Sequence, residues 1–159
     1  AKPADLEKAL LCAVDAGYRH IDCSPIYGNE ETVGTALQMK FAYGSVKRED
    51  MFITSKVQTN TEIPATGSSS LIFEDIPIEE TWKVEMEKLV DAGLVKSIGV
   101  CNFNATQIER VLKICTIKPV MLQIEISVNF MNEHLVEFAH SYGIQVTAYA
   151  PLGSPAMIQ

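Results

Sequence analysis

The sequence of 159 residues lacks several features that mark common classes of protein. No apolar run approaches the roughly 20 residues that cross a bilayer, and the acidic start, AKPADLEKALL, has no hydrophobic segment typical of a signal peptide. The four cysteines form no C-x-x-C pair and match no zinc-ligand spacing. We therefore expect a cytoplasmic protein with reduced, buried thiols, no bound metal and no membrane partner.

Positive charge is also scarce. Thirteen basic and twenty acidic residues give a net charge of -7, which disfavours nonspecific binding to nucleic acid. Hydrophobic residues make up 47% and charged residues 21%, a balance typical of soluble globular proteins. We expect a single domain over residues 1–159 that acts on a small molecule.

Helical and strand-like patterns alternate along the chain. Apolar spacing predicts a helix from about residue 104 and helices over residues 4–16, 29–40, 77–92 and 132–142. Short apolar runs predict strands over residues 19–23, 51–55, 97–101, 120–124 and 144–149. Apolar strands separated by helices favour a parallel sheet covered by helices. Only residues 57–77, rich in Thr, Ser, Gly and Pro, show no periodicity.

Polar side chains fall near the ends of all five predicted strands. These residues are Asp22, Lys56, Asn102, Gln123, Glu125 and Tyr149. Each alone has a simpler interpretation: a turn former, a surface lysine, a rim aromatic or an amide that satisfies loop backbone. Together they indicate a site, because active sites of barrels and of open parallel sheets lie at the carboxyl ends of the strands.

Two of these residues, together with Tyr27, suit the reduction of a carbonyl group. A tyrosine is a poor acid, with an ordinary pKa near 10, and a nearby ammonium lowers the pKa of the phenol and eases proton release. A carboxylate can hold the ammonium in place by a charge-assisted hydrogen bond. Tyr27, Lys56 and Asp22 could form such a set, since Tyr27 lies on the loop that leaves the same strand as Asp22.

Five segments resemble one known family, in the same order. They are GYRHIDCSPIYGNEETVG (17–34), FITSK (52–56), GLVKSIGVCNFN (93–104), LQIE (122–125) and TAYAPLGS (147–154). They are similar to motifs of the aldo-keto reductases, which are α/β proteins with a (β/α)8 TIM barrel. The resemblance implies reduction of aldehydes and ketones to alcohols with NADPH, and an incomplete barrel of about five parallel strands.

The resemblance also implies roles for individual residues. Tyr27 would be the proton donor, supported by Asp22 and Lys56. The other matched positions would bind the cofactor. Of these, Asn102 and Gln123 would contact the nicotinamide carboxamide, Tyr149 would stack on its ring, Leu152 and Ser154 would lie along the pyrophosphate, and Cys101 stands where the family usually has serine.

The departures from the family pattern are equally specific. The family's catalytic histidine, in an H-W-P motif, has no counterpart, and the first, fourth and eighth barrel strands are missing from the matched motifs. His20, His134 and His140 are not expected to replace that histidine. We expect strands 51–55 and 97–101 to become neighbours in one open five-stranded sheet, with weak cofactor binding and little or no reductase activity.

Two other functions stay open at this point. The chain could be a non-enzymatic scaffold or interaction module derived from the same fold. An unrelated (β/α) hydrolase or lyase is also conceivable, but it would need a metal cluster or a Ser–His pair at the strand ends, and the sequence shows neither.

Overall fold

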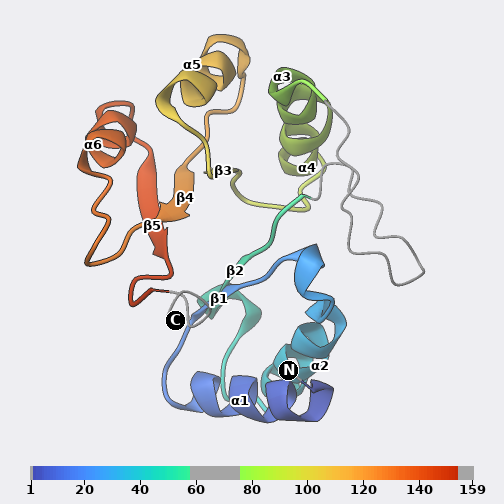
Figure 1. Cartoon of the computed structure of the whole chain (residues 1–159). Coiled ribbons are helices and arrows are strands. Elements are labelled where there is room, and N and C mark those ends of the chain that lie inside the picture. Colours follow the sequence, from blue (N-terminus) through green and yellow to red (C-terminus); the bar gives the residue numbers. More distant parts are fainter. Residues whose placement is uncertain (1, 58–75, 154–159) are drawn as a thin grey trace, which may run out of the picture. The chain divides into compact units, whose positions relative to one another are not determined.

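The computed structural model describes residues 2–57 and 76–153. The chain divides into two compact units, Ala1–Glu74 and Asp75–Gln159 (Figure 1). Most of the irregular segment 57–77 lies outside the described residues, as does Ser154.

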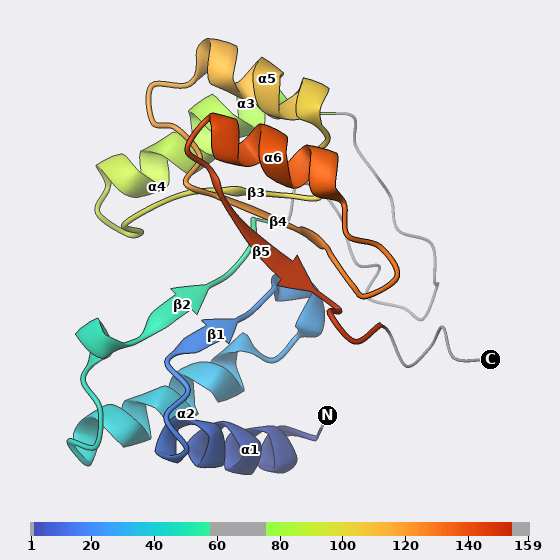
Figure 2. The ribbon, with the colours of Figure 1, turned by 90° about the vertical axis from the view of Figure 1, so that its left-hand side faces the viewer.

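In the first unit, two helices cover one face of a two-stranded parallel sheet (Figure 2). The sheet pairs β1 with β2 in a register that runs from His20↔Phe52 to Asp22↔Thr54. Its ladder extends by one hydrogen bond at each end, from Phe52 N to Arg19 O and from Cys23 N to Thr54 O. The elements are α1 (Pro3–Asp15), β1 (His20–Asp22), α2 (Glu30–Ala42) and β2 (Phe52–Thr54), with one-turn 3-10 helices at Pro25–Tyr27 and Arg48–Asp50.

The packing of the first unit follows from the alternation of side chains in its strands. Ile21 and Ile53, in the middle of the two strands, pack towards the helices. His20 and Asp22 therefore belong to the opposite face of β1, where the site residues lie. The buried residues of this core are Leu10, Val14, Cys23, Val33, Ala36, Leu37, Val46 and Met51.

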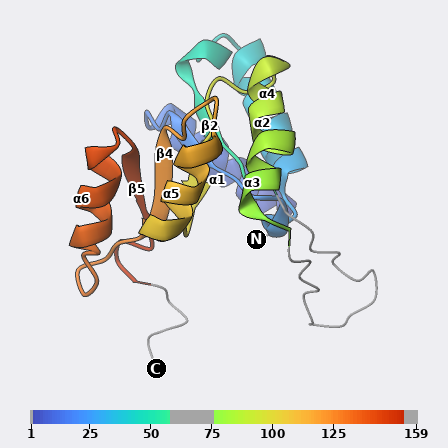
Figure 3. The ribbon, with the colours of Figure 1, turned by 90° about the horizontal axis from the view of Figure 1, so that it is seen from above.

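In the second unit, three parallel strands in the order β3-β4-β5 lie under helices on one face (Figure 2). The helix that precedes the sheet is continuous but changes type, from α3 through a π-helical stretch to α4 (Figure 3). The elements are α3 (Ile78–Glu80), the π stretch Thr81–Met86, α4 (Glu87–Asp91), β3 (Val100–Cys101), α5 (Ala105–Ile114), β4 (Met121–Glu125), α6 (Glu133–Ser141) and β5 (Gln145–Tyr149).

Helix α5 shows how local sequence sets this arrangement. Asn104 and Gln107 form a reciprocal capping box that satisfies exposed backbone N–H groups at the helix start. Ile108 and Val111 lie one turn apart and are fully buried against the sheet. Leu112, the next apolar residue of the helix, is partly buried against the same core.

Two side chains of the π and α4 stretch hold the connection between α5 and β4. Glu87 accepts hydrogen bonds from the backbone N–H groups of Thr116 and Ile117, at 2.6 and 3.0 Å. Trp82 donates from Nε1 to the carbonyl of Ile117 at 3.2 Å. Both side chains are buried, so this clamp lies inside the core of the second unit.

The α/β class and the parallel pairing of strands within each unit are confirmed. Hydrogen bonds within the described residues join the strands as one sheet of two and one of three. Each sheet packs against helices of its own unit.

All four cysteines are free, as predicted, but their burial differs. Cys23 is buried and Cys101 and Cys115 are partly buried, whereas Cys12 on α1 is exposed. Among the described residues, no helix is both long and apolar enough to cross a bilayer.

Candidate active site

The first unit brings Asp22 and Lys56 into direct contact. Asp22 ends β1 and is paired in register with Thr54, so Lys56, two residues further on, points to the same face of the sheet. The Lys56 ammonium donates to both carboxylate oxygens of Asp22, at 3.0 Å each. The predicted link between these two strand ends is present in the structure.

The ammonium of Lys56 has a third acceptor, the backbone carbonyl of Cys23, at 2.9 Å. A lysine ammonium has three N–H donors, and these three oxygens match that number. The position of the carbonyl is fixed because the N–H of Cys23 donates to Thr54 O at 2.7 Å in the ladder. The charge of Lys56 is thus held firmly at the end of the two strands.

Tyr27 lies beside this charge and presents its ring to it. The Lys56 nitrogen is 5.7 Å from the centroid of the Tyr27 ring, a cation–π contact. Lys56 contacts the face of the Tyr27 ring. The structure therefore brings Asp22, Tyr27 and Lys56 together, while the role of the phenol as proton donor stays a prediction.

A tight turn places Tyr27 within reach of a substrate. The 3-10 helix Pro25–Tyr27 ends at Gly28, whose φ of 60° is in the left-handed region that glycine tolerates. The side chain of Tyr27 is 53% exposed. An accessible phenol next to a fixed positive charge is an arrangement that can donate a proton.

The surroundings of the Asp22–Lys56 pair carry mainly negative charge. Burial raises the pKa of the Cys23 thiol, the carboxylates of Glu30 and Asp22 raise it further, and the nearby Lys56 only partly opposes them. Glu30 is therefore a second carboxylate close to the Asp22–Lys56 pair. The sequence reasoning overlooked it because glutamate in the first turn of a helix is common for helix stability alone.

The second unit holds the predicted cofactor residues at the carboxyl end of its sheet. Cys101 and Gln123 are paired across β3 and β4, with Cys101 Sγ 3.8 Å from Gln123 Oε1. Asn102 follows β3 with a φ of 60°, and its N–H donates to Gln123 O at 2.9 Å. Two carboxamide side chains thus lie at neighbouring strand ends.

Tyr149 completes this group at the end of β5. Burial raises the pKa of the Tyr149 phenol, the nearby Glu125 and Cys101 raise it further, and a side-chain hydrogen bond with Asn102 acts in the opposite direction. The side chain remains 37% exposed, so the ring is accessible. The influence of Asn102 on Tyr149 was not predicted, because spacing in the sequence does not reveal which strand-end side chains lie close together.

The two remaining cofactor candidates contribute little to this group. Leu152 is 92% exposed, and Ser154 lies outside the described residues. No lysine or arginine follows Lys118 in the sequence. Residues 119–153 therefore offer no cation for a phosphate.

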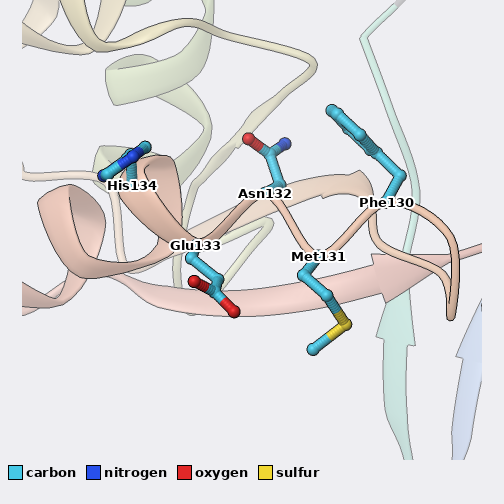
Figure 4. Close-up of a pocket in the computed structure, with 5 residues that line it drawn as sticks. All are labelled: Phe130, Met131, Asn132, Glu133 and His134. Atoms are coloured by element: carbon cyan, nitrogen blue, oxygen red, sulfur yellow. The ribbon is translucent and has the colours of Figure 1, made fainter.

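A shallow hollow of about 350 Å³ lies in the loop between β4 and α6. Phe130, Met131, Asn132, Glu133 and His134 line it, but their side chains do not point at a common centre (Figure 4). Phe130 is 52% exposed. His134 and His140 are also exposed, on α6. Within the described ranges, no group of three potential ligands could hold a metal ion.

Comparison with known proteins agrees with these motifs. The Aldo/keto reductase family model matches residues 1–76 and 68–158. Aldo-keto reductase family 1 member A1-A of Danio rerio is 35% identical over 192 residues, which cover 96% of this chain and 59% of the relative. Two solved structures have a TM-score of 0.87: the aldose reductase of Schistosoma japonicum (40% identity, 96% of this chain, 63% of that chain) and that of Giardia lamblia (32%, 97% and 64%).

The extent of these matches is informative. The chain spans about three-fifths of the length of the zebrafish relative. The aligned stretch of 192 residues is longer than the chain of 159, so the relative has residues inside the match that have no counterpart here. The two family-model matches overlap at residues 68–76, within the segment 57–77 that shows no periodicity. Two family-model matches that together span almost the whole chain show that this protein belongs to the aldo/keto reductase family.

Proposed function

We propose that this chain is an NADPH-binding carbonyl reductase in origin, whose turnover of aldehydes and ketones is strongly impaired or lost. The observation that carries the proposal is the position of Lys56, which is bonded to Asp22 at 3.0 Å and lies over the ring of Tyr27 at 5.7 Å. The family membership supports the same chemistry. The substrate class would be small aldehydes or ketones.

The residues of the first unit suit the proton transfer of this reaction. As a carbonyl carbon is reduced, its oxygen gains negative charge and takes a proton, which the Tyr27 hydroxyl would give. The positive charge of Lys56 would stabilise the phenolate that remains. Asp22 would hold Lys56 in position through the paired hydrogen bonds.

The residues of the second unit suit one end of the cofactor only. The amides of Asn102 and Gln123 offer both donors and acceptors, which a nicotinamide carboxamide requires, and the exposed ring of Tyr149 offers a stacking surface. When bound, NADPH would supply the hydride. Its phosphates find no cation in residues 119–153, and each charged hydrogen bond that is missing would cost roughly 1.5–3 kcal/mol of affinity.

The missing histidine is the second reason to expect low activity. No H-W-P motif follows Lys56. Of the histidines present, His20 is engaged with Thr54, with Nε2 and Oγ1 2.9 Å apart, and His134 and His140 lie on α6. General acid–base assistance is typically worth about 10²–10⁴-fold in rate.

A direct assay tests this proposal. NADPH absorbance is followed with nitrobenzaldehyde in the presence of the purified chain and of its Tyr27→Phe variant. We expect no steady loss of absorbance above background from either protein. Turnover by the wild-type chain that the Tyr27→Phe variant lacks would show that the reductase is competent and that the proposed impairment is wrong.

A non-enzymatic scaffold is the second candidate. The comparison favours it, because the aligned relative has residues inside the match that have no counterpart in this chain. The two candidates differ in cofactor binding: a chain of reductase origin that keeps its amide and tyrosine group should bind NADPH weakly, and a pure scaffold should not bind it.

A further inference from the structure

A hydrogen bond outside the predicted set joins the two segments that carry Tyr27 and Lys56. The hydroxyl of Ser55 donates to the carboxylate of Glu30. Ser55 directly precedes Lys56, and Glu30 is the first residue of α2, three residues after Tyr27. The bond therefore connects the loop that leaves β1 to the segment that leaves β2.

This connection matters because the other anchors of Lys56 lie at the end of β1, four or more residues before Tyr27. Lys56 is tied to Asp22 and to the carbonyl of Cys23. Tyr27 is held by its own turn, in which its N–H donates to Ser24 O at 3.0 Å. A cation–π contact at an exposed site is worth only about 0.5–1 kcal/mol, so by itself it does not fix the separation of Tyr27 and Lys56.

We propose that Glu30 is a positioning residue, which sets the contact between Tyr27 and Lys56 by accepting a hydrogen bond from Ser55. The inference rests on the proposed function, since it concerns the pair that would transfer the proton. Glu30 has a second, separable effect, because its negative charge raises the pKa of the Cys23 thiol beside the pair.

The chain offers variants that separate the bond from the charge. Glu30→Gln keeps an oxygen that can accept from Ser55 but removes the charge. Ser55→Ala removes the bond and keeps the charge, and Glu30→Ala removes both. Ser45→Ala is a matched control, because the hydroxyl of Ser45 makes only a local bond to the carbonyl of Lys40, at 3.2 Å.

The experiment reads the contact itself and does not depend on turnover. In NMR spectra of the full chain, the Tyr27 ring should shift the side-chain methylene signals of Lys56 upfield, and Tyr27→Leu defines the value without the ring. We expect Ser55→Ala and Glu30→Ala to lose most of this shift, and Glu30→Gln and Ser45→Ala to keep it. Glu30→Gln should also lower the pKa of the Cys23 thiol, which Ser55→Ala should leave in place.

The possible outcomes distinguish a failure of the positioning role of Glu30 from a failure of the proposed function. If Ser55→Ala keeps the full Lys56 shift, the positioning role of Glu30 is wrong while the pair itself stands. If the wild-type chain already shows the same Lys56 signals as Tyr27→Leu, the pair is absent and the proposed function loses its main support. If Glu30 only stabilises the fold, Glu30→Gln, Ser55→Ala and Glu30→Ala would all lower the free energy of unfolding, and Glu30→Gln would lose the Lys56 shift as well. That result would contradict the positioning role.

Discussion

Lys56 and Asp22 are joined by two hydrogen bonds of equal length, 3.0 Å from the ammonium to each carboxylate oxygen. The pair connects the ends of β1 and β2, the two strands of the first unit. The side chains are 24% and 39% exposed, respectively, so solvent partly screens their attraction. Such a pair orients the lysine more than it stabilises the fold.

Replacement of Asp22 by Asn tests whether the pair mainly orients Lys56 or mainly stabilises the fold. We expect Asp22→Asn to lower the free energy of unfolding by only about 0.5 kcal/mol, as for other partly exposed ion pairs. The measurement is urea unfolding followed by circular dichroism. Glu49→Gln is the control, because the ion pair of Glu49 with Lys47 spans 3.7 Å and is far more exposed, so that no loss is expected. A loss of several kcal/mol in Asp22→Asn would mean that the pair is mainly structural.

Gly99 is required by the close approach of β4. A Cβ atom at position 99 would lie 2.5 Å from the backbone oxygen of Met121. We expect Gly99→Ala to destabilise the second unit by about 1–3 kcal/mol, the usual cost of overpacking. The fluorescence of Trp82, the single tryptophan and a residue of this core, reports its unfolding.

A glycine without such a neighbour gives the opposite expectation. Gly34 lies within α2, and a Cβ atom there meets nothing within 4 Å. Gly34→Ala should stabilise the first unit by about 0.5–1 kcal/mol, because alanine favours the helix. Circular dichroism during urea unfolding measures this change in the free energy of unfolding. Destabilisation by Gly34→Ala or a neutral Gly99→Ala would contradict the packing described for each position.

The buried carboxyl of Glu87 should make the second unit sensitive to acid. Burial raises its pKa, but hydrogen bonds from the N–H groups of Ile117 and Thr116, with Lys83 nearby, outweigh this and hold the pKa below the ordinary 4.5. A lowered pKa in the folded state gives stability that is present above pH 4.5 and lost as the pH falls through the folded value.

A substitution separates the charge of Glu87 from its shape. Glu87→Gln should flatten the loss of stability below about pH 4.5, and Glu87→Ala should cost about 2–3 kcal/mol near neutral pH, because two backbone N–H groups lose their acceptor. Unfolding followed by Trp82 fluorescence between neutral and acid pH measures both effects. If the loss of stability at acid pH is as steep in Glu87→Gln as in the wild type, other carboxyl groups cause that loss.

Tyr149 should titrate above its ordinary pKa of 10.0. Because Glu125 contributes to the rise, Glu125→Gln should lower the pKa of Tyr149, whereas Asn102→Ala should raise it by removing a hydrogen bond that favours the phenolate. Ultraviolet titration, taken as the difference from Tyr149→Phe, measures the shift. Glu137→Gln on the exposed face of α6 is the control. Shifts of the same sign in Glu125→Gln and Asn102→Ala would contradict this electrostatic account.

The sequence predicted the elements well, because each one is encoded locally. The helix around Ile108 and Val111 follows from apolar spacing and the capping box at Asn104, and the alternation of strands and helices implies parallel pairing. Which strands pair within each sheet was not predictable in this way, because local patterns do not show which strands are neighbours.

The sequence named the candidate residues and predicted the bond between Asp22 and Lys56, but it did not predict the other contacts around them. Asp22 and Lys56 are named by their motifs, and register brings them to one face. The third anchor of Lys56 is the backbone carbonyl of Cys23, which no side-chain pattern reveals. The bond between Ser55 and Glu30 likewise depends on how α2 starts next to the end of β2.

Fluorescence titration of NADPH against the purified chain tests the central claim most directly. The account predicts weak but saturable binding, which Asn102→Ala and Tyr149→Ala reduce and which Lys113→Ala, on α5, leaves unchanged. An absence of saturable binding by the wild-type chain, or binding that neither Asn102→Ala nor Tyr149→Ala affects, would contradict it and favour the scaffold.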